Sequence, residues 1–521
     1  MDQLYIDEQK YWKCTRCEQI NPGQELCQSQ ACLSKMEERL CLVCKQIKPI
    51  YTGQKNCSTC VIKSIELKFG RCIECKIVNT GKNWCRICNS KRFQQNFNNW
   101  TSGNDDIDKF IQNIQLSALS HYQLLEWIPY ERFSKPIYIA EGGFGKVYKA
   151  KWKDGYILYW DLNENKWKRN YQNDGNYVDV ALKILNNSQK ITFEFINEIA
   201  LYSKIHEVKI SDLVIRCYGI SQDPETKDYI MVMKYADNGN LRNYLRIKKK
   251  KSHKVKKKLN LDSKLLTYKF KINIIKNITS GLKKIHGKGF IHRDLHIGNI
   301  VCFVNSVCIT DMGFCKPANY NELENTKKNV YGVLPYVAPE ILRGNPYTKF
   351  SDIYSLGIIM YEILSELPPY YDISHDGYLA LNICKGLRPR YDIEVPQLIL
   401  HVIKRCLDAN PLNRPSTKEL ARTFNEWIDD FNKYLKNIMD KKESIKPELV
   451  KQIEDINDSS SDSNLSKMHP KAIYTSRLLD FNNLPKPKNS HDYYKDYNNI
   501  SNLKYSEPDF SWSSNSSNES I

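Results

Sequence analysis

The sequence has 521 residues, with 77 Lys and Arg against 59 Asp and Glu, which gives a formal net charge of +18. This length accommodates one large domain with additional modules, so we expect two or three regions. No apolar run is long enough to cross a bilayer, and the first residues lack the apolar core of a signal peptide. These features exclude secreted and membrane-spanning classes, and we expect an intracellular protein that is cytoplasmic or also nuclear.

Twelve of the 18 cysteines fall in the first hundred residues, in three groups of four that form an internal repeat. Each group contains a Cys-x2-Cys unit, a short spacer with a glycine turn, and a second cysteine pair. Four facing thiolates make a tetrahedral zinc site, and units this small cannot fold by hydrophobic burial alone. We therefore predict three zinc knuckles over residues 1–92, with the ligands Cys14, Cys17, Cys27, Cys32, Cys41, Cys44, Cys57, Cys60, Cys72, Cys75, Cys85 and Cys88.

A disulfide-stapled or oxidised segment is the alternative, but the repeated spacing and the expected compartment favour a metal. The first group fits least well, because the spacing Cys27-x4-Cys32 departs from the double Cys-x2-Cys pattern. The units resemble zinc ribbons or rubredoxin-like knuckles, and that resemblance indicates a metal without indicating a ligand. Both a protein partner and nucleic acid stay open for this region, with nucleic acid less favoured.

Residues 93–132 are expected to form a linker with a docking helix, because Ile107, Ile111 and Ile114 recur at helical spacing. The next segment, 139–148, has the pattern strand, glycine turn, strand. Glycines allow backbone amides to approach phosphate oxygens closely, although such a turn is often a plain hairpin.

Residues 178–184 alternate between apolar and other side chains, which predicts a strand with Ala181 and Lys183 on one face. In the helix that follows, Glu198 falls on the apolar face, where a carboxylate needs a cation. Glu194, one turn earlier, is an alternative carboxylate. We have no functional account of the insertion at 154–177, and we expect the lysine-dense run 248–258 to be a solvated loop.

Residues 291–299 read Ile-His-Arg-Asp-Leu-His-Ile-Gly-Asn and follow an amphipathic helical run. Here Asp294 can accept a proton from a hydroxyl group while the oxygen of Asn299 binds a hard cation. The segment resembles the catalytic loop of eukaryotic protein kinases, and further motifs of that family follow in order. They are Asp311-Met312-Gly313, Ala338-Pro339-Glu340 and an arginine, Arg414, that pairs with the glutamate in the family.

The resemblance implies an α+β fold with a small β-rich lobe and a large helical lobe over 133–431, and it implies that Lys183 is the partner of Glu198. Beyond residue 431 the chain turns polar and serine-rich, so we expect a largely disordered tail over 432–521. The resemblance also implies ATP and Mg²⁺, with Asp294 as the base and Lys183 on the α- and β-phosphates. Asn299 and Asp311 would hold the magnesium. The implied nucleotide-binding residues are Ala140, Gly142, Gly143, Gly145, Val147, Ala181, Lys183, Glu198, Met233 and Ala236.

The function expected from these motifs is transfer of the ATP γ-phosphate to hydroxyl groups of a protein substrate. Tyr336 and the absence of an arginine between Asp294 and Asn299 favour serine and threonine, in the manner of the tyrosine-kinase-like group; a tyrosine or dual-specificity kinase is an alternative. A pseudokinase scaffold is a second alternative, because Ala140, His296, Met312 and Val333 depart from the family pattern. A third alternative assigns the protein's main function to the zinc repeats.

Overall fold

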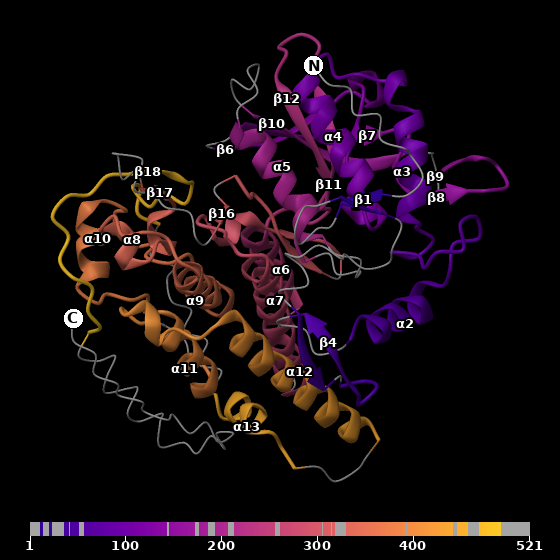
Figure 1. Ribbon diagram of the computed structural model, residues 1–521. Coiled ribbons are helices and arrows are strands. Elements are labelled where there is room, and N and C mark those ends of the chain that lie inside the picture. Colours follow the sequence, from indigo (N-terminus) through magenta and orange to yellow (C-terminus); the bar gives the residue numbers. More distant parts are fainter. Residues whose placement is uncertain are drawn as a thin grey trace, which may run out of the picture. The chain divides into compact units, whose positions relative to one another are not determined.

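The computed structural model describes residues 11–13, 20–22, 36–40, 42–51, 57–142, 145–171, 177–185, 193–206, 213–255, 261–304, 306–313, 315–317, 330–390, 394–440, 445–456 and 468–490. The chain divides into two compact units. The N-terminal unit consists of Met1–Leu124 together with Gly155–Tyr171, and the C-terminal unit consists of Leu125–Asp154 together with Gln172–Ile521. Figure 1 labels their elements.

In its described residues, the N-terminal unit contains short hairpins and three α-helices. Its elements before the insertion are β1 (Tyr11–Lys13), β2 (Ile20–Pro22), β3 (Met36–Leu40), β4 (Ile47–Tyr51), α2 (Ser58–Phe69), α3 (Arg86–Gln95) and α4 (Asp105–Ser117). The side chain of Asn104 caps α4 by accepting hydrogen bonds from the amides of Asp106 and Ile107. Ile107 and Ile111 are fully buried, and α4 packs against α3. The predicted helix is present, but it belongs to this unit, which extends to Leu124 rather than ending at residue 92.

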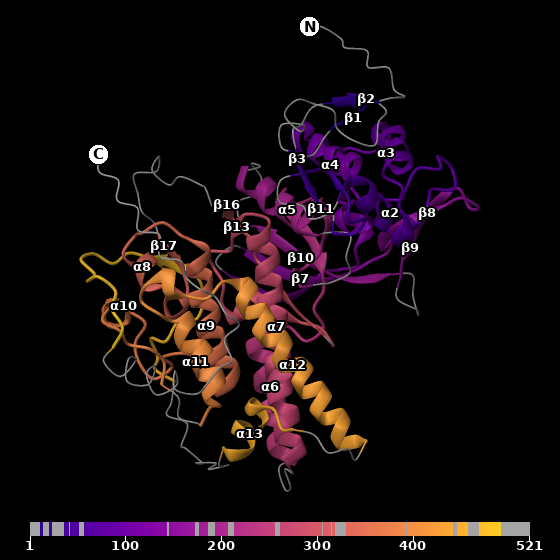
Figure 2. The same ribbon diagram turned by 60° about the horizontal axis from the view of Figure 1, so that its bottom comes forward.

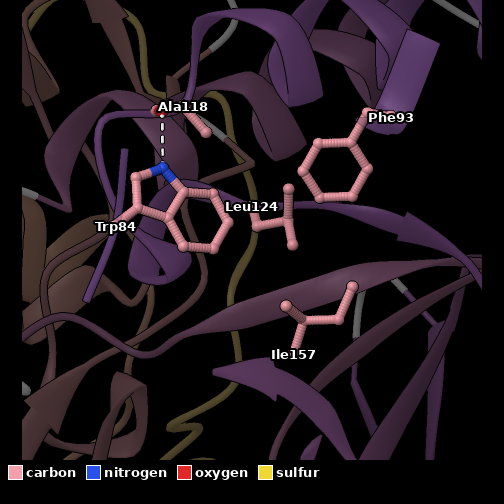
Figure 3. Packing of buried hydrophobic residues seen from close by; sticks show 5 residues of the cluster. All are labelled: Trp84, Phe93, Ala118, Leu124 and Ile157. Atoms are coloured by element: carbon pink, nitrogen blue, oxygen red, sulfur yellow. Dashed lines mark hydrogen bonds between the residues drawn. The ribbon is translucent and has the colours of Figure 1, made fainter. Parts of the chain in front are cut away.

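The insertion that had no sequence-based account forms a hairpin of β8 (Tyr156–Asp161) and β9 (Lys166–Asn170). It belongs to the N-terminal unit, where Ile157 joins a buried apolar cluster with Trp84, Phe93, Ala118 and Leu124 (Figure 3). The indole Nε1 of Trp84 donates a hydrogen bond to the Ala118 carbonyl at 3.0 Å. On β9, the ring of Trp167 stacks on that of Phe93 at 4.6 Å between centroids.

A six-stranded sheet forms the first part of the C-terminal unit, in the order β5-β11-β12-β10-β7-β6. Gly219 pairs with Glu126 where β5 joins the sheet in parallel, and a Cβ atom there would lie 2.0 Å from the Glu126 carbonyl oxygen. One helix, α5 (Phe193–Ile205), packs against β11. The strands are β5 (Glu126–Trp127), β6 (Ile137–Gly142), β7 (Gly145–Trp152), β10 (Val178–Leu185), β11 (Cys217–Gln222) and β12 (Tyr229–Lys234).

The second part of the C-terminal unit is helical, which confirms the predicted α+β arrangement of a sheet-rich lobe and a helical lobe. Its helices are α6 (Leu241–Val255), α7 (Leu261–Gly287), α8 (Pro339–Leu342), α9 (Lys349–Ser365), α10 (Gly377–Cys384), α11 (Gln397–Cys406), α12 (Thr417–Met439) and α13 (Glu448–Asp455). The long helices α7 and α12 lie side by side (Figure 2). Every residue of α9 from Ser351 to Ser365 is buried, so this helix forms the centre of the lobe. Among the described residues, no helix has the length and apolarity needed to cross a bilayer.

Two expectations for this lobe are corrected. The lysine-dense run was expected to be a loop, but α6 continues through it as far as Val255. The domain boundary expected at residue 431 falls inside α12, which ends at Met439 and is followed by α13 and by the described segment 468–490. Leu449, Val450 and Ile453 of α13 are buried, and α13 packs on α7. Packing against a distant helix stabilises a segment whose own apolar pattern is too short to predict a domain.

Short strand pairs frame the region around the catalytic-loop motif. They are β13 (Phe290–Ile291) with β16 (Lys316–Pro317), β14 (Ile300–Cys302) with β15 (Val307–Ile309), and β17 (Val330–Gly332) with β18 (Arg477–Leu479). The last pair joins two segments that are distant in the sequence, and both strands are labelled in Figure 1.

The carboxylate of Asp352, in the first turn of α9, holds the backbone of the catalytic-loop motif. It accepts hydrogen bonds from the amide of His292 at 2.8 Å and from the amide of Arg293 at 3.0 Å. His286 Nε2 on α7 lies 2.7 Å from the same carboxylate. Burial tends to raise the pKa of Asp352, but the bonds and charge of His286 and the His292 amide outweigh it and lower this pKa. Arg293 has a φ of +72°, so the loop depends on this anchor to keep a left-handed residue in place.

We predict that Trp84→Ala destabilises the N-terminal unit by about 3–5 kcal/mol, because it removes the largest buried side chain at the junction of repeat and insertion. Hydrogen exchange of the intact chain should then show lost protection in both α3 and the β8–β9 hairpin. Leu162→Ala on the same hairpin is the control, since Leu162 is 44% exposed and should change protection little. Unchanged protection in Trp84→Ala would contradict this description of the core.

We predict that Asp352→Asn lowers the free energy of unfolding by about 2–3 kcal/mol at neutral pH, because a charged acceptor of two buried amides is lost. The folded-state pKa of Asp352 lies below its usual value of 3.8, so its stabilising contribution is present above that value and is lost as the pH falls through the folded pKa. Urea unfolding measured at several pH values should show a constant difference above about pH 5 and a shrinking one below it. A difference that grows with acidification would contradict the assignment.

Candidate active site

Asp294 and Asn299 lie together on the catalytic-loop motif, beside the short turn Ile297–Asn299. The side-chain nitrogen Nδ2 of Asn299 donates to the Asp294 backbone carbonyl oxygen at 3.0 Å and to Asp294 Oδ2 at 3.3 Å. Because the nitrogen is committed to Asp294, the Asn299 side chain presents its oxygen as the atom that can bind a cation. Both side chains are largely buried, so their orientations are fixed by packing and by this bond.

By the resemblance to protein kinases, His296 stands where serine/threonine kinases carry lysine, and its ring faces Asp294. Its Nδ1 accepts a hydrogen bond from the Gly298 amide at 3.1 Å, so a neutral ring carries its proton on Nε2. Nε2 lies 3.7 Å from Asp294 Oδ2. Burial tends to raise the pKa of Asp294, but His296 and a hydroxyl donor from Ser476 outweigh it and lower this pKa. Asp294 is therefore a carboxylate that can accept a proton at neutral pH.

Lys183 joins three elements at one point. Its Nζ lies 3.0 Å from Glu198 Oε1 on α5 and 2.8 Å from Asp311 Oδ1 after β15. Burial tends to lower the pKa of Lys183, but the carboxylates of Asp311 and Glu198 raise it above its usual value, so the ammonium form is favoured. The predicted partner of Lys183 is thus Glu198, and Asp311 is a second one.

The segment around Asp311 is tightly packed. Asp311 has a φ of +63°, a conformation that is uncommon outside glycine. A Cβ atom on Gly313 would lie 3.2 Å from Glu198 Oε2, so glycine suits this close approach. Met312 is fully buried, and its amide donates to the Tyr202 hydroxyl at 3.2 Å. Methionine therefore occupies an enclosed slot where the family has phenylalanine.

Several predicted nucleotide-binding residues lie on paired strands of the sheet. The register places Val147 opposite Lys183 and Met233 opposite Ala181, with Ala236 just beyond β12. In the glycine turn, Ala140 pairs with Val147, and Gly142 pairs with Gly145. Gly143 lies outside the described residues.

Two cysteine groups come together as the spacing predicts. The four sulfurs of Cys72, Cys75, Cys85 and Cys88 lie within 4.8 Å of one another, as do those of Cys44, Cys57 and Cys60. The contacts Cys75–Cys85 and Cys72–Cys88 measure 3.5 and 3.7 Å, close to the separation of about 3.8 Å for sulfurs placed tetrahedrally 2.3 Å from zinc. Cys41 and the first group, Cys14, Cys17, Cys27 and Cys32, lie outside the described residues.

The two cysteine groups share a backbone feature at equivalent positions of the sequence repeat. Lys45 and Lys76 each follow the second cysteine of a Cys-x2-Cys unit, and both have a positive φ, 56° and 62°. The amide of Lys76 donates to the Cys72 carbonyl at 3.0 Å, which closes the turn. This recurrence indicates that the two repeats fold alike.

One residue at the site was missed by the sequence reasoning. The hydroxyl of Ser476, from the expected disordered tail, donates to Asp294 Oδ2 at 2.7 Å. The only local signal is the short apolar pair Leu478 and Leu479 that follows, which is too brief to predict a strand.

Comparisons with known proteins agree with this geometry. The family model of protein tyrosine and serine/threonine kinases matches residues 135–424. A relative from Dictyostelium discoideum named "Probable serine/threonine-protein kinase" is 27% identical over 284 residues, 54% of this chain and 18% of its own length. The dual specificity protein kinase shkD of the same organism is 33% identical over 181 residues, 32% of this chain and 23% of its own length.

The tyrosine-protein kinase SPK-1 of Girardia tigrina is 27% identical over 301 residues, 56% of this chain and 52% of its own length. The chain thus spans well under two thirds of each of these relatives. The family match covers more than half of the chain and includes Lys183, Asp294, Asn299 and Asp311. The chain belongs to the family of protein tyrosine and serine/threonine kinases.

Proposed function

We propose that this protein transfers the γ-phosphoryl group of ATP to hydroxyl groups of protein substrates. The observation that carries the proposal is the joint placement of the Lys183–Glu198–Asp311 cluster, in which Lys183 and Glu198 are buried, and the Asp294–Asn299 pair, within a chain of the kinase family. Magnesium-bound ATP supplies the phosphoryl group and the charge neutralisation that such a reaction needs.

The residues present fit a magnesium–nucleotide complex. Asn299 presents its amide oxygen, and the Asp311 side chain keeps 23% exposure although its Oδ1 contacts Lys183. Carboxylate and amide oxygens are ligands that Mg²⁺ accepts, usually together with phosphate oxygens. We assign the metal to Asn299 and Asp311 and the phosphates to Lys183 and the glycine turn.

Asp294 is assigned as the base that orients the acceptor hydroxyl and takes its proton. Its lowered pKa keeps it ionised, and its bond from Asn299 fixes the direction of its carboxylate. His296 Nε2 faces the same oxygen and would place a hydrogen-bond donor near the acceptor.

We infer that serine or threonine is the acceptor. Tyr336 and the absence of an arginine between Asp294 and Asn299 support this, and so does the contact of a serine hydroxyl, Ser476, with Asp294. The relatives carry serine/threonine, dual-specificity and tyrosine names, so tyrosine is the alternative.

We also propose that the cysteine repeats bind structural zinc. The support is the spacing of the sulfurs in the Cys72–Cys88 group and the shared turn at Lys45 and Lys76. Small units of this kind derive their folding free energy largely from the metal. A protein partner is the favoured ligand of these repeats over nucleic acid, because their basic residues are sufficiently explained by a solvated surface.

Asp294→Asn is expected to lower phosphate transfer to a generic protein acceptor by about 10²–10⁴-fold, because the positioned base is lost. The assay uses radiolabelled ATP with magnesium, and hydrolysis of the product identifies the labelled amino acid. Asp429→Asn, an exposed position on α12, is the matched control and should leave the rate unchanged. If the wild type binds nucleotide but transfers no phosphate, the pseudokinase reading replaces this proposal.

Native mass spectrometry of the intact chain should detect at least two zinc ions, one for each described cysteine group. Cys75→Ser should lose one ion, since a tetrahedral site loses one of four thiolates. The control is Cys302→Ser, a buried cysteine of β14 outside the groups, which should retain the full zinc content. Equal zinc content in the two variants would refute the assignment.

A further inference from the structure

The tail segment 468–490 crosses the helical lobe and forms part of the site. Its strand β18 pairs antiparallel with β17, with Gly332 opposite Arg477 and Val330 opposite Leu479. β17 lies between the Asp311 motif and Glu340, so the tail adds a strand to the edge that adjoins the base. Main-chain pairing of this kind is how extended peptides are commonly bound.

The pairing places Ser476 at Asp294. Its hydroxyl donates to Asp294 Oδ2 at 2.7 Å, and its Oγ lies 3.3 Å from His296 Nε2, which carries the proton of a neutral ring. A Cβ atom on Gly332 would lie 3.1 Å from Val337 and 3.5 Å from Asp294, so glycine allows the strand to approach this closely. The serine hydroxyl thus makes the contact that a proton acceptor needs with its substrate.

Side chains on both sides of Ser476 anchor the segment. Two residues before it, the Tyr474 hydroxyl donates to the Pro369 carbonyl at 2.9 Å, and the Arg242 guanidinium lies 4.5 Å from the Tyr474 ring centre. Three residues after it, Leu479 is only 4% exposed. These contacts fix the position of the serine along β17.

Hydrogen bonds to His375 and Cys384 of the helical lobe also hold the tail segment. The amide of Ile473 donates to His375 Nδ1 at 3.1 Å, and the guanidinium of Arg477 donates to the His375 carbonyl. Further along, the amide of Lys488 donates to the Cys384 carbonyl at 3.0 Å. The docking therefore extends over the whole segment and is not limited to a single contact.

We propose that Ser476 is an autophosphorylation site, which the tail presents to the active site of its own chain. The proposal rests on the function proposed above. In the reaction, Ser476 Oγ forms a bond to the γ-phosphorus of ATP while the bond from that phosphorus to the β,γ-bridging oxygen breaks. The electron pair leaves with ADP, and the serine proton passes to Asp294.

The contact also has a consequence for other substrates. A peptide from another protein needs the same β17 edge and the same Asp294 oxygen, so it competes with the docked tail. Once phosphorylated, Ser476 carries up to two negative charges beside the Asp294 carboxylate, which repels it. Modification of Ser476 therefore releases the tail from the β17 edge, and transfer to an added substrate begins with a lag.

The experiment follows phosphate at position 476 by peptide mass spectrometry in the intact chain, with magnesium, ATP and dephosphorylated casein as an added acceptor. The variants are Ser476→Ala, the inactive Asp294→Asn, and Thr475→Ala as the matched control, because Thr475 is exposed and adjacent. Each protein is assayed over about a hundred-fold range of concentration, since a tethered acceptor has a fixed effective concentration.

We expect phosphate at Ser476 in the wild type and in Thr475→Ala, with a first-order rate constant that does not change with protein concentration. Ser476→Ala and Asp294→Asn should show none at this position. Labelled casein with an unmodified Ser476 would overturn this inference alone, and so would a rate constant that rises in proportion to protein concentration. Absence of label on both acceptors would overturn the proposed function and this inference with it.

Discussion

The ammonium group of Lys183 is the point on which the arrangement of the C-terminal unit depends. It lies between carboxylates from two other elements, Glu198 on α5 and Asp311 after β15, and Asp311 is 128 residues away in the sequence. A buried charge is tolerated only when it is paired, and removal of one partner leaves the others uncompensated. The strand β10, the helix α5 and the loop after β15 must therefore meet for any of the three charges to be buried. The charges that suit a triphosphate thus also hold these elements together.

The parts of this site that follow from the sequence are those with a local period. The two-residue alternation around Ala181 and Lys183 places both on one face of β10, and the helical period places Glu198 inward on α5. Asp294 and Asn299 share one loop, so their proximity needs no long-range information. The order of motifs then supplies the fold, because the family resemblance relates segments that periodicity alone cannot connect.

The features that did not follow from the sequence are made of contacts between distant segments. Trp167 of the insertion stacks on Phe93 of α3, and neither residue lies in a periodic pattern that indicates its partner. Tyr474 and Leu479 lie in a polar tail, and it is the receiving lobe that buries Leu479 and supplies the carbonyl to which the Tyr474 hydroxyl donates. The polar composition of such a segment predicts disorder, because composition carries no information about a binding surface elsewhere in the same chain.

The β8–β9 hairpin limits how the parts of this protein can be exchanged between genes by recombination. The chain enters or leaves the N-terminal unit at three places, after Leu124, before Gly155 and after Tyr171, so the cysteine repeats are not an appendage joined by one linker. A recombination event that removed residues 1–124 would leave Ile157 and Trp167 without their apolar partners. One that donated the repeats to another kinase would lack the hairpin that completes their core. The two units can therefore be exchanged between genes only together.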